Sequence, residues 1–175
     1  VYCLRGSDGT QKWSFTTGYC VNSSPAIADV DGDGGAEVVI GSEDYKVYCL
    51  RGSDGTQKWS FTTGGGVNSS PAIADVDGDG GAEVVIGSND DRVYCLRGSD
   101  GTQKWSFTTR ADVHLPGALA DVDGDGRLEF LVSQVNNDTL YCLNAEDGTL
   151  AWKIALAIDV HSPFAGDIDG DGCIE

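Results

Sequence analysis

The sequence repeats itself every 46 residues, and each repeat contains the same nine-residue acidic loop. The loops begin at Asp29, Asp75, Asp121 and Asp167 and read DVDGDGGAE twice, then DVDGDGRLE and DIDGDGCIE. A repeat of this length is typical of architectures in which each unit packs against its neighbours, so the core is expected to be distributed along the chain. Carboxylates at loop positions 1, 3, 5 and 9, with Gly at positions 4 and 6, predict a tight turn rich in hard oxygen ligands, which suits Ca²⁺.

The acidic loops account for the charge of the chain. Its 175 residues include 28 acidic and 11 basic side chains, which give a formal net charge of -17. Three Asp and one Glu in each of four loops make 16 carboxylates, so the other 12 acidic residues nearly balance the 11 basic ones. This surface has no basic cluster, which argues against nucleic acid and anionic lipid as partners. No run of 18 apolar residues predicts membrane insertion.

Within each unit, four short segments have the composition of β-strands. Around the first acidic loop these segments are PAIADV, EVVIGS, KVYCLRG and QKWSFTTG, which are rich in Val, Ile, Tyr, Trp, Phe and Thr. An Asp-Gly pair between the third and fourth segments, as at Asp54-Gly55, favours a tight hairpin. No segment has helical character. The pattern therefore predicts an all-β fold, a β-propeller of four-stranded antiparallel blades.

Two features of the repeat resemble known families. The DxDxDGxxE loop between two strands is similar to the calcium loop of FG-GAP repeats, as in integrin alpha-chain propellers, and it covers all four units. The segment VYCLRGSDGTQKW, with Gly9 and Trp13 four residues apart, resembles the tryptophan-docking repeat of PQQ-like (quinoprotein-type) propellers. The chain lacks the Phe-Gly and Gly-Ala-Pro elements of FG-GAP repeats and has Glu where Asp is more usual at loop position 9. The resemblance implies an architecture more strongly than a function.

The chain is predicted to be a single repeat array over residues 1–175. Its units are 1–46, 47–92, 93–139 and 140–175, the last without its final strand. Because the chain does not begin with Met, it is interpreted as a processed or partial chain. Similar families have six to eight blades, so the four units are expected to belong to a larger ring or an assembly, while closure as a small four-bladed propeller stays open.

The resemblance to integrin-type loops implies one Ca²⁺ site in each unit, about four in all. The implied side-chain ligands are Asp29, Asp31, Asp33 and Glu37; Asp75, Asp77, Asp79 and Glu83; Asp121, Asp123, Asp125 and Glu129; and Asp167, Asp169, Asp171 and Glu175. The implied main-chain carbonyl ligands are those of Gly35, Gly81, Arg127 and Cys173. A helix-flanked loop of the EF-hand type would need a carboxylate at position 12, where Ile40, Ile86 and Val132 stand instead. Mg²⁺ is the closest rival ion.

The first two units, residues 1–46 and 47–92, differ at only five positions. The differing pairs are Tyr19/Gly65, Cys20/Gly66, Glu43/Asn89, Tyr45/Asp91 and Lys46/Arg92. In a four-stranded blade these positions fall in the 2–3 and 4–1 loops, on the face opposite to the acidic loops. Three N-glycosylation sequons, at Asn22, Asn68 and Asn137, lie in or beside the same loops. Sequence variation and any glycan are therefore expected opposite to the metal.

Three other sets of residues have structural interpretations. The tryptophans that end each QKW-like segment are predicted to pack between blades: Trp13, Trp59, Trp105 and Trp152. The cysteines at one equivalent position are predicted to be buried thiols: Cys3, Cys49, Cys95 and Cys142. Cys20 and Cys173 break this pattern and are candidates for a disulfide or an intermolecular bond, and His114 and His161 are interpreted as polar loop residues.

The functional hypothesis is a non-enzymatic, calcium-binding repeat module that is extracellular or on a cell surface and serves as an adhesion or assembly scaffold. No acidic pair outside the loops shows general acid/base spacing. The expected partners are other protein chains, including copies of this chain at unpaired blade edges, with carbohydrate as a further candidate. Two alternatives stay open: a protomer of a structural filament or multi-chain ring, and a scaffold fragment of a carbohydrate-active enzyme.

Overall fold

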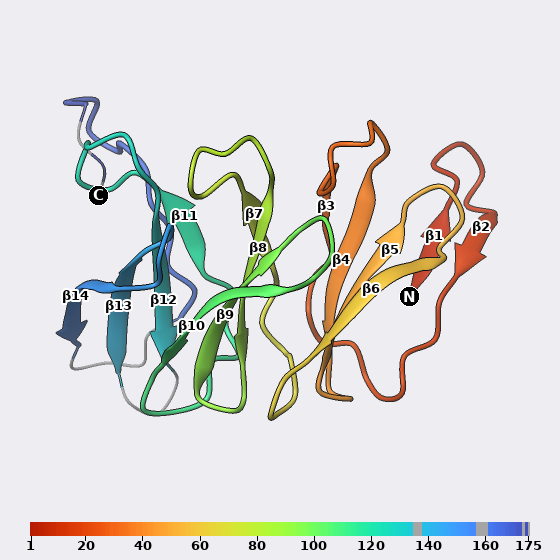
Figure 1. The fold of residues 1–175 in the computed structure, drawn as a ribbon, viewed down its shortest axis with the longest axis horizontal. Coiled ribbons are helices and arrows are strands. Elements are labelled where there is room, and N and C mark those ends of the chain that lie inside the picture. Colours follow the sequence, from red (N-terminus) through yellow and green to blue (C-terminus); the bar gives the residue numbers. More distant parts are fainter. Residues whose placement is uncertain (135–137, 157–160, 173, 175) are drawn as a thin grey trace.

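The structure is a computed structural model that describes residues 1–134, 138–156, 161–172 and 174. These residues contain β-strands and no helix, so the part of the chain described here holds no helix that could cross a membrane. Three four-stranded antiparallel sheets and one two-stranded sheet stand side by side in an open arc (Figure 1). The predicted all-β fold of four-stranded antiparallel blades is confirmed, and the unclosed arc makes it a partial β-propeller.

The strands follow one another in sequence order within every sheet. The two-stranded sheet contains β1 (Tyr2–Leu4) and β2 (Gln11–Ser14). The first blade contains β3 (Ala26–Ala28), β4 (Glu37–Ser42), β5 (Lys46–Arg51) and β6 (Gln57–Thr62). The second blade contains β7 (Ala72–Ala74), β8 (Glu83–Ser88), β9 (Arg92–Arg97) and β10 (Gln103–Thr108). The third blade contains β11 (Ala118–Ala120), β12 (Glu129–Gln134), β13 (Thr139–Asn144) and β14 (Leu150–Ala155).

The hydrophobic core lies between the sheets, because strands such as β4 bury both of their faces. Val38 and Ile40 of β4 belong to the cluster that contains Trp13 of the two-stranded sheet. Val39, which points to the other face, joins a cluster shared with Val84 of the second blade. A strand buried on both sides needs an unbroken apolar run, which explains why EVVIGS does not alternate with polar residues.

Three of the four repeated tryptophans join one sheet to the next, as predicted. Each indole Nε1 donates to a main-chain carbonyl of the following blade: Trp13 to Gly52 at 2.9 Å, Trp59 to Gly98 at 2.7 Å and Trp105 to Ala145 at 2.9 Å. These three side chains are 7–8 % exposed, whereas Trp152 on the outer face of β14 is 43 % exposed. The hydrogen bond explains why Trp rather than another large apolar residue occupies this position.

The acidic loops and the Asp-Gly turns share one edge of the arc. The β3–β4 and β7–β8 loops lie on the upper side of Figure 1. Gly52, at the β5–β6 turn, donates its N–H to the carbonyl of Ala36 beside the first acidic loop at 2.9 Å. On the opposite edge, Glu43 in the β4–β5 turn donates its N–H to the carbonyl of Cys20 at 2.9 Å. One edge of the blades therefore carries the acidic loops and the Asp-Gly turns, and the other carries turns such as β4–β5.

The repeated cysteines are confirmed as buried thiols at three of their four positions. Cys49, Cys95 and Cys142 are fully buried and Cys3 is half-buried. Cys20 is an exposed free thiol, and the candidate bridge to Cys173 falls outside the described residues.

Burial of these thiols predicts a fall in stability at alkaline pH. It raises the pKa of Cys49 and Cys95 to about 12 and that of Cys142 to about 11, from an ordinary value of 9.0. The unfolded chain therefore releases these protons first, so the free energy of unfolding falls as pH rises through about 9. Urea midpoints from neutral to alkaline pH test this, with a Cys49→Ala/Cys95→Ala/Cys142→Ala variant as control. If the urea midpoint fell equally with pH in both proteins, the buried thiols would not be the cause of the loss of stability.

Candidate metal centre

The first residue of each acidic loop and the two glycines that follow it shape the turn. The carboxylate of Asp29 accepts hydrogen bonds from the N–H groups of Gly32 at 2.8 Å and Gly34 at 2.9 Å. Gly32 and Gly34 have φ angles of +75° and +85°, which side chains other than glycine rarely adopt. The same bonds, at 2.6–2.9 Å, recur at Asp75 with Gly78 and Gly80, Asp121 with Gly124 and Gly126, and Asp167 with Gly170 and Gly172. The predicted role of the glycines is confirmed.

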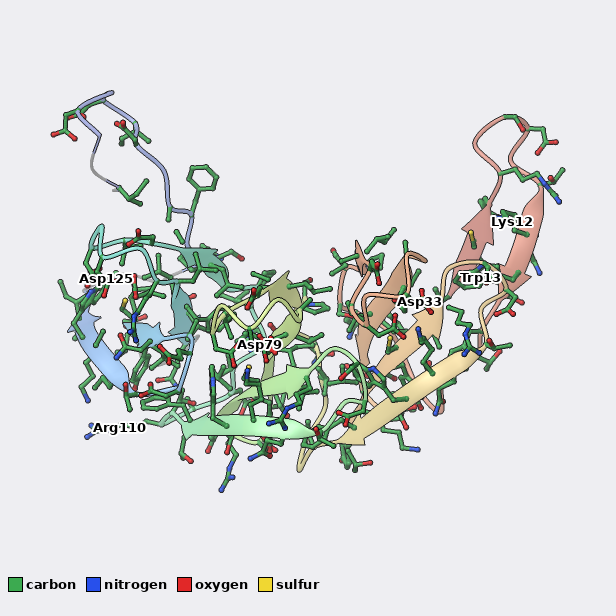
Figure 2. All side chains as sticks on the ribbon, turned by 45° about the horizontal axis from the view of Figure 1, so that its top comes forward. Lys12, Trp13, Asp33, Asp79, Arg110 and Asp125 are labelled. Carbon is green, nitrogen blue, oxygen red and sulfur yellow. The ribbon has the colours of Figure 1, made fainter. Side chains whose placement is uncertain are left out.

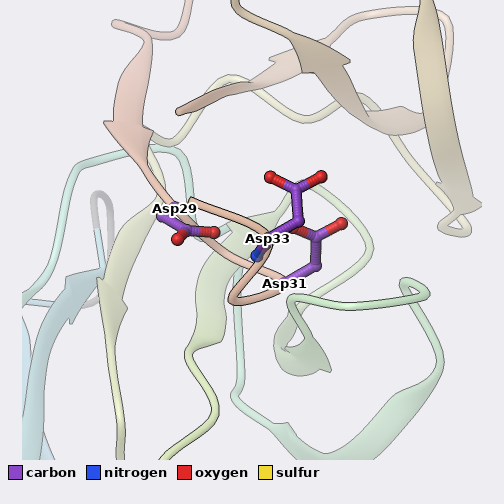
Figure 3. Close-up of side chains that lie close together, drawn as sticks. All are labelled: Asp29, Asp31 and Asp33. Carbon is purple, nitrogen blue, oxygen red and sulfur yellow. Dashed lines mark hydrogen bonds between the residues drawn. The ribbon is translucent and has the colours of Figure 1, made fainter. Parts of the chain in front are cut away.

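Each loop brings three carboxylates together. In the first loop, Asp29, Asp31 and Asp33 each offer one oxygen atom, and these atoms lie within 4.8 Å of one another (Figure 3). The corresponding groups are Asp75, Asp77 and Glu83; Asp121, Asp123 and Glu129; and Asp167, Asp169 and Asp171. Three negatively charged oxygens at this spacing can hold a metal ion between them.

The glutamate at loop position 9 is buried at the start of the second strand in all three blades. Glu37, Glu83 and Glu129 are only 2–3 % exposed. Their carboxylates accept hydrogen bonds from the N–H groups of Val30, Val76 and Val122 at 3.0–3.2 Å. For Glu129, burial and repulsion from the three Asp carboxylates of its loop raise the pKa. A buried carboxylate among other carboxylates needs a positive charge nearby.

Two lysines that the sequence interpretation missed supply such a charge. Lys58 of β6 donates its Nζ to Asp31, to Asp33 at 3.2 Å and to Glu37 at 3.2 Å. Burial alone would lower the pKa of Lys58, but its hydrogen bonds to the three carboxylates outweigh burial and raise the pKa.

The second blade repeats the arrangement. Lys104 of β10 pairs with Asp77 and, at 3.2 Å, with Glu83. Each ammonium group takes the place of a cation among the carboxylates of its own loop. The candidate ligand groups found in the described residues contain only carboxylates, without sulfur or imidazole, which fits Ca²⁺ or Mg²⁺ better than softer metals.

The structure describes some of the other predicted ligands and not others. Arg127 pairs its Nη1 with Glu146 at 2.5 Å, which leaves only its main chain for a metal. Coordination by the carbonyls of Gly35, Gly81 and Arg127 stays a prediction. Asp79 and Asp125 lie on the same loops (Figure 2), where each accepts the N–H of the residue two positions later at 2.7 and 2.8 Å. Cys173 and Glu175 fall outside the described residues.

The predicted glycosylation sites lie on the edge opposite to the acidic loops. Asn22 is exposed, and its Nδ2 donates to Glu43 at 2.9 Å and to Asn68 at 3.3 Å. Asn68 is half-buried, and Asn137 falls outside the described residues. The position opposite to the loops is confirmed for Asn22 and Asn68, and their modification stays a prediction.

Fold and site together define a β-propeller repeat module whose blades each carry an acidic, metal-competent loop at one edge. A family model described as FG-GAP-like repeat matches residues 29–86, 75–132 and 121–175. The overlapping matches cover most of the sequence, so the chain belongs to the FG-GAP-like repeat family. The FG-GAP part of the resemblance is thereby confirmed, whereas the PQQ-like part stays a prediction. A search of curated proteins finds no match to this chain.

Solved structures share the fold at low sequence identity. The structure of BamB from Moraxella catarrhalis has a TM-score of 0.62 and 18 % identity, covering 83 % of this chain and 40 % of that one. BBS1N in complex with ARL6DN, soaked with mercury, has a TM-score of 0.67 and 15 % identity, covering 95 % and 50 %. The lead-soaked form of that complex has a TM-score of 0.63 and 16 % identity, covering 90 % of this chain and 48 % of that one. This chain therefore spans half or less of the length of these structures.

Proposed function

We propose that this chain is a non-enzymatic, calcium-binding propeller module that acts as an extracellular scaffold for binding other proteins. The observation that carries the calcium assignment is the convergence of three carboxylate oxygens within 4.8 Å in each of four loops. A bound Ca²⁺ would supply two positive charges where each loop concentrates negative charge. Extracellular fluid, with about 2 mM Ca²⁺, would load sites with Kd values of roughly 0.1 to 1 mM, a range that suits extracellular modules.

The chain's own residues prepare these sites. Asp29 fixes the turn through the N–H groups of Gly32 and Gly34, which leaves Asp31 and Asp33 facing the same point. Burial holds Glu37 in place beside them. Since hydrogen bonds from main-chain N–H groups to Asp29 fix the turn, a cation entering the loop needs little rearrangement of the main chain.

The number of bound Ca²⁺ ions tests the assignment. We expect about four per chain by equilibrium dialysis, one for each acidic loop. Asp77→Asn/Asp79→Asn should lower this number by one, because it removes two of the negative charges of the second loop and leaves the other loops intact. Asp54→Asn, which removes a carboxylate from a turn outside the acidic loops, is the matched control. Uptake that is absent, or that is unchanged in the loop variant, would overturn the calcium assignment.

The opposite edge supports the second half of the proposal, a protein-binding surface. A groove of about 490 Å³ is lined by Tyr19, Glu43, Tyr45, Gly64, Gly65, Gly66, Asn68 and Asn89. Six of these eight residues stand at positions that differ between the first two units, which are otherwise identical. Tyr, Asn and Gly are among the residues enriched in the recognition loops of antibodies. The related fold of BBS1N was solved in complex with a protein, ARL6DN.

Tyr45 places an aromatic ring in this groove from a backbone conformation that bulky residues rarely adopt. Its φ angle is +70° and its side chain is 52 % exposed, an unfavourable conformation for a bulky residue. We expect Tyr45→Asn to raise the free energy of unfolding by about 1 kcal/mol, because Asn tolerates this conformation. Urea denaturation measures it, with Tyr19→Asn as control. Destabilisation by Tyr45→Asn would show instead that the ring stabilises the fold.

A further inference from the structure

We propose that Lys58 and Lys104 compete with Ca²⁺ for the carboxylates of the first and second acidic loops, and that the third loop, whose blade carries Ala151 at the equivalent position, binds Ca²⁺ more tightly. This inference rests on the proposed calcium function. It assigns different affinities to loops that have nearly the same sequence.

The ammonium groups pair with carboxylates that a metal would use. Lys58 contacts Asp31 and Asp33, two of the three carboxylates that converge in the first loop. Lys104 contacts Asp77 and Glu83, two of the three in the second loop. An ion that binds these oxygens must therefore displace the ammonium group, so the lost ion pairs subtract from its binding free energy.

The backbone places both lysines for this contact. In the first blade, Trp59 pairs with Cys49 and Gln57 pairs with Leu50, so Lys58 is the extra residue of a β-bulge. Lys104 occupies the same bulge in the second blade. A β-bulge redirects a side chain relative to the regular strand. The lysine side chains are only 9 % and 11 % exposed, so each is enclosed beside its loop.

The third blade has the same bulge without the lysine. Trp152 pairs with Cys142 and Leu150 pairs with Leu143, which leaves Ala151 as the extra residue. In the described part of the chain, no lysine or arginine forms an ion pair with the carboxylates of the third loop. Arg127, although it belongs to this loop, pairs with Glu146. The third site is therefore open to a metal ion without displacement of a resident charge.

Calcium titration of the full chain by calorimetry tests the inference, with thermal melting in EDTA as a second readout. Lys58→Met/Lys104→Met keeps the length of both side chains and removes their charge. We expect it to raise the Ca²⁺ affinity of the two weaker sites by about tenfold or more, since like charges no longer compete. In EDTA the same variant should melt at a lower temperature, because the carboxylates lose their internal counter-ions.

The converse substitution, Ala151→Lys, should lower the Ca²⁺ affinity of the third loop by a similar factor, about tenfold. It lies at an exposed position of β14, so it leaves the core untouched. Lys12→Met is the matched control, because Lys12 occupies the equivalent bulge in β2 and pairs with no carboxylate in the described residues. It should change neither readout.

The outcomes separate this inference from the proposed function. Equal Ca²⁺ affinities in the wild type, Lys58→Met/Lys104→Met and Ala151→Lys would overturn the competition while leaving calcium binding in place. Weaker binding in the double Met variant would also overturn it, since the lysines would then support the site. Complete absence of Ca²⁺ binding in the wild type would overturn the proposed function itself.

Discussion

Removal of Ca²⁺ is expected to lower the melting temperature of this chain by roughly 5 to 25 °C. At about 2 mM Ca²⁺, one site with a Kd of roughly 0.1 to 1 mM stabilises the folded chain by ~0.6 to 1.8 kcal/mol, so four sites contribute ~2 to 7 kcal/mol. Thermal unfolding followed by circular dichroism, in Ca²⁺ and in EDTA, measures the shift. The size of the effect follows from mass action, because only the folded chain brings the carboxylates together.

The effect should extend beyond the loops, because each loop also contributes to the packing between blades. Val30, inside the first acidic loop, is 2 % exposed and belongs to the cluster between the first and second blades. Val76 has the same role between the second and third blades. Repulsion that opens a loop therefore also withdraws an apolar residue from the core.

Two controls make this prediction specific. Mg²⁺ at the same concentration should restore less of the melting temperature, since it gives up its water less readily than Ca²⁺ does. A variant with Asn in place of Asp31, Asp77, Asp123 and Asp169 should melt at the same temperature in Ca²⁺ and EDTA. A wild-type melting temperature that does not respond to EDTA would contradict a stabilising role for the metal.

Local sequence signals were sufficient to predict the blade. The run of β4 is apolar at consecutive positions because Val38 and Val39 face different neighbouring sheets. This apolar run predicted the strand. Asp54 accepts the N–H of Thr56 at 2.9 Å, and Gly55 has a φ angle of +75°, so the Asp-Gly pair specifies its own turn. Each of these features depends on residues close together in the chain.

The lysines of the candidate site could not be predicted in this way, because their position depends on a β-bulge. A bulge adds one residue to a strand and changes which side chain reaches the loop, and nothing in the alternation of QKWSFT indicates it. The usable signal was a comparison between units: Lys58 and Lys104 precede a Trp, whereas Ala151 precedes the equivalent Trp. The left-handed backbone conformation of Tyr45 could not be predicted either, because bulky residues rarely adopt positive φ angles.

Substitution of Gly101 by Ala is expected to destabilise the chain by about 2 to 5 kcal/mol. Gly101 has a φ angle of +73°, which an alanine adopts only with strain. A Cβ atom there would also lie 2.6 Å from the indole ring of Trp59 in the preceding blade. Two costs therefore add, one from the backbone and one from the contact between blades.

Gly9→Ala separates these two costs. Gly9 occupies the same turn of β1 and β2 with a φ angle of +70°, but a Cβ atom there would meet nothing within 4 Å. This variant should lose only the backbone part, about 1 kcal/mol. The difference between the two variants in urea denaturation measures how strongly Trp59 docks on the next blade. Equal losses would mean that the indole of Trp59 moves aside without cost, which would contradict tight docking at this contact.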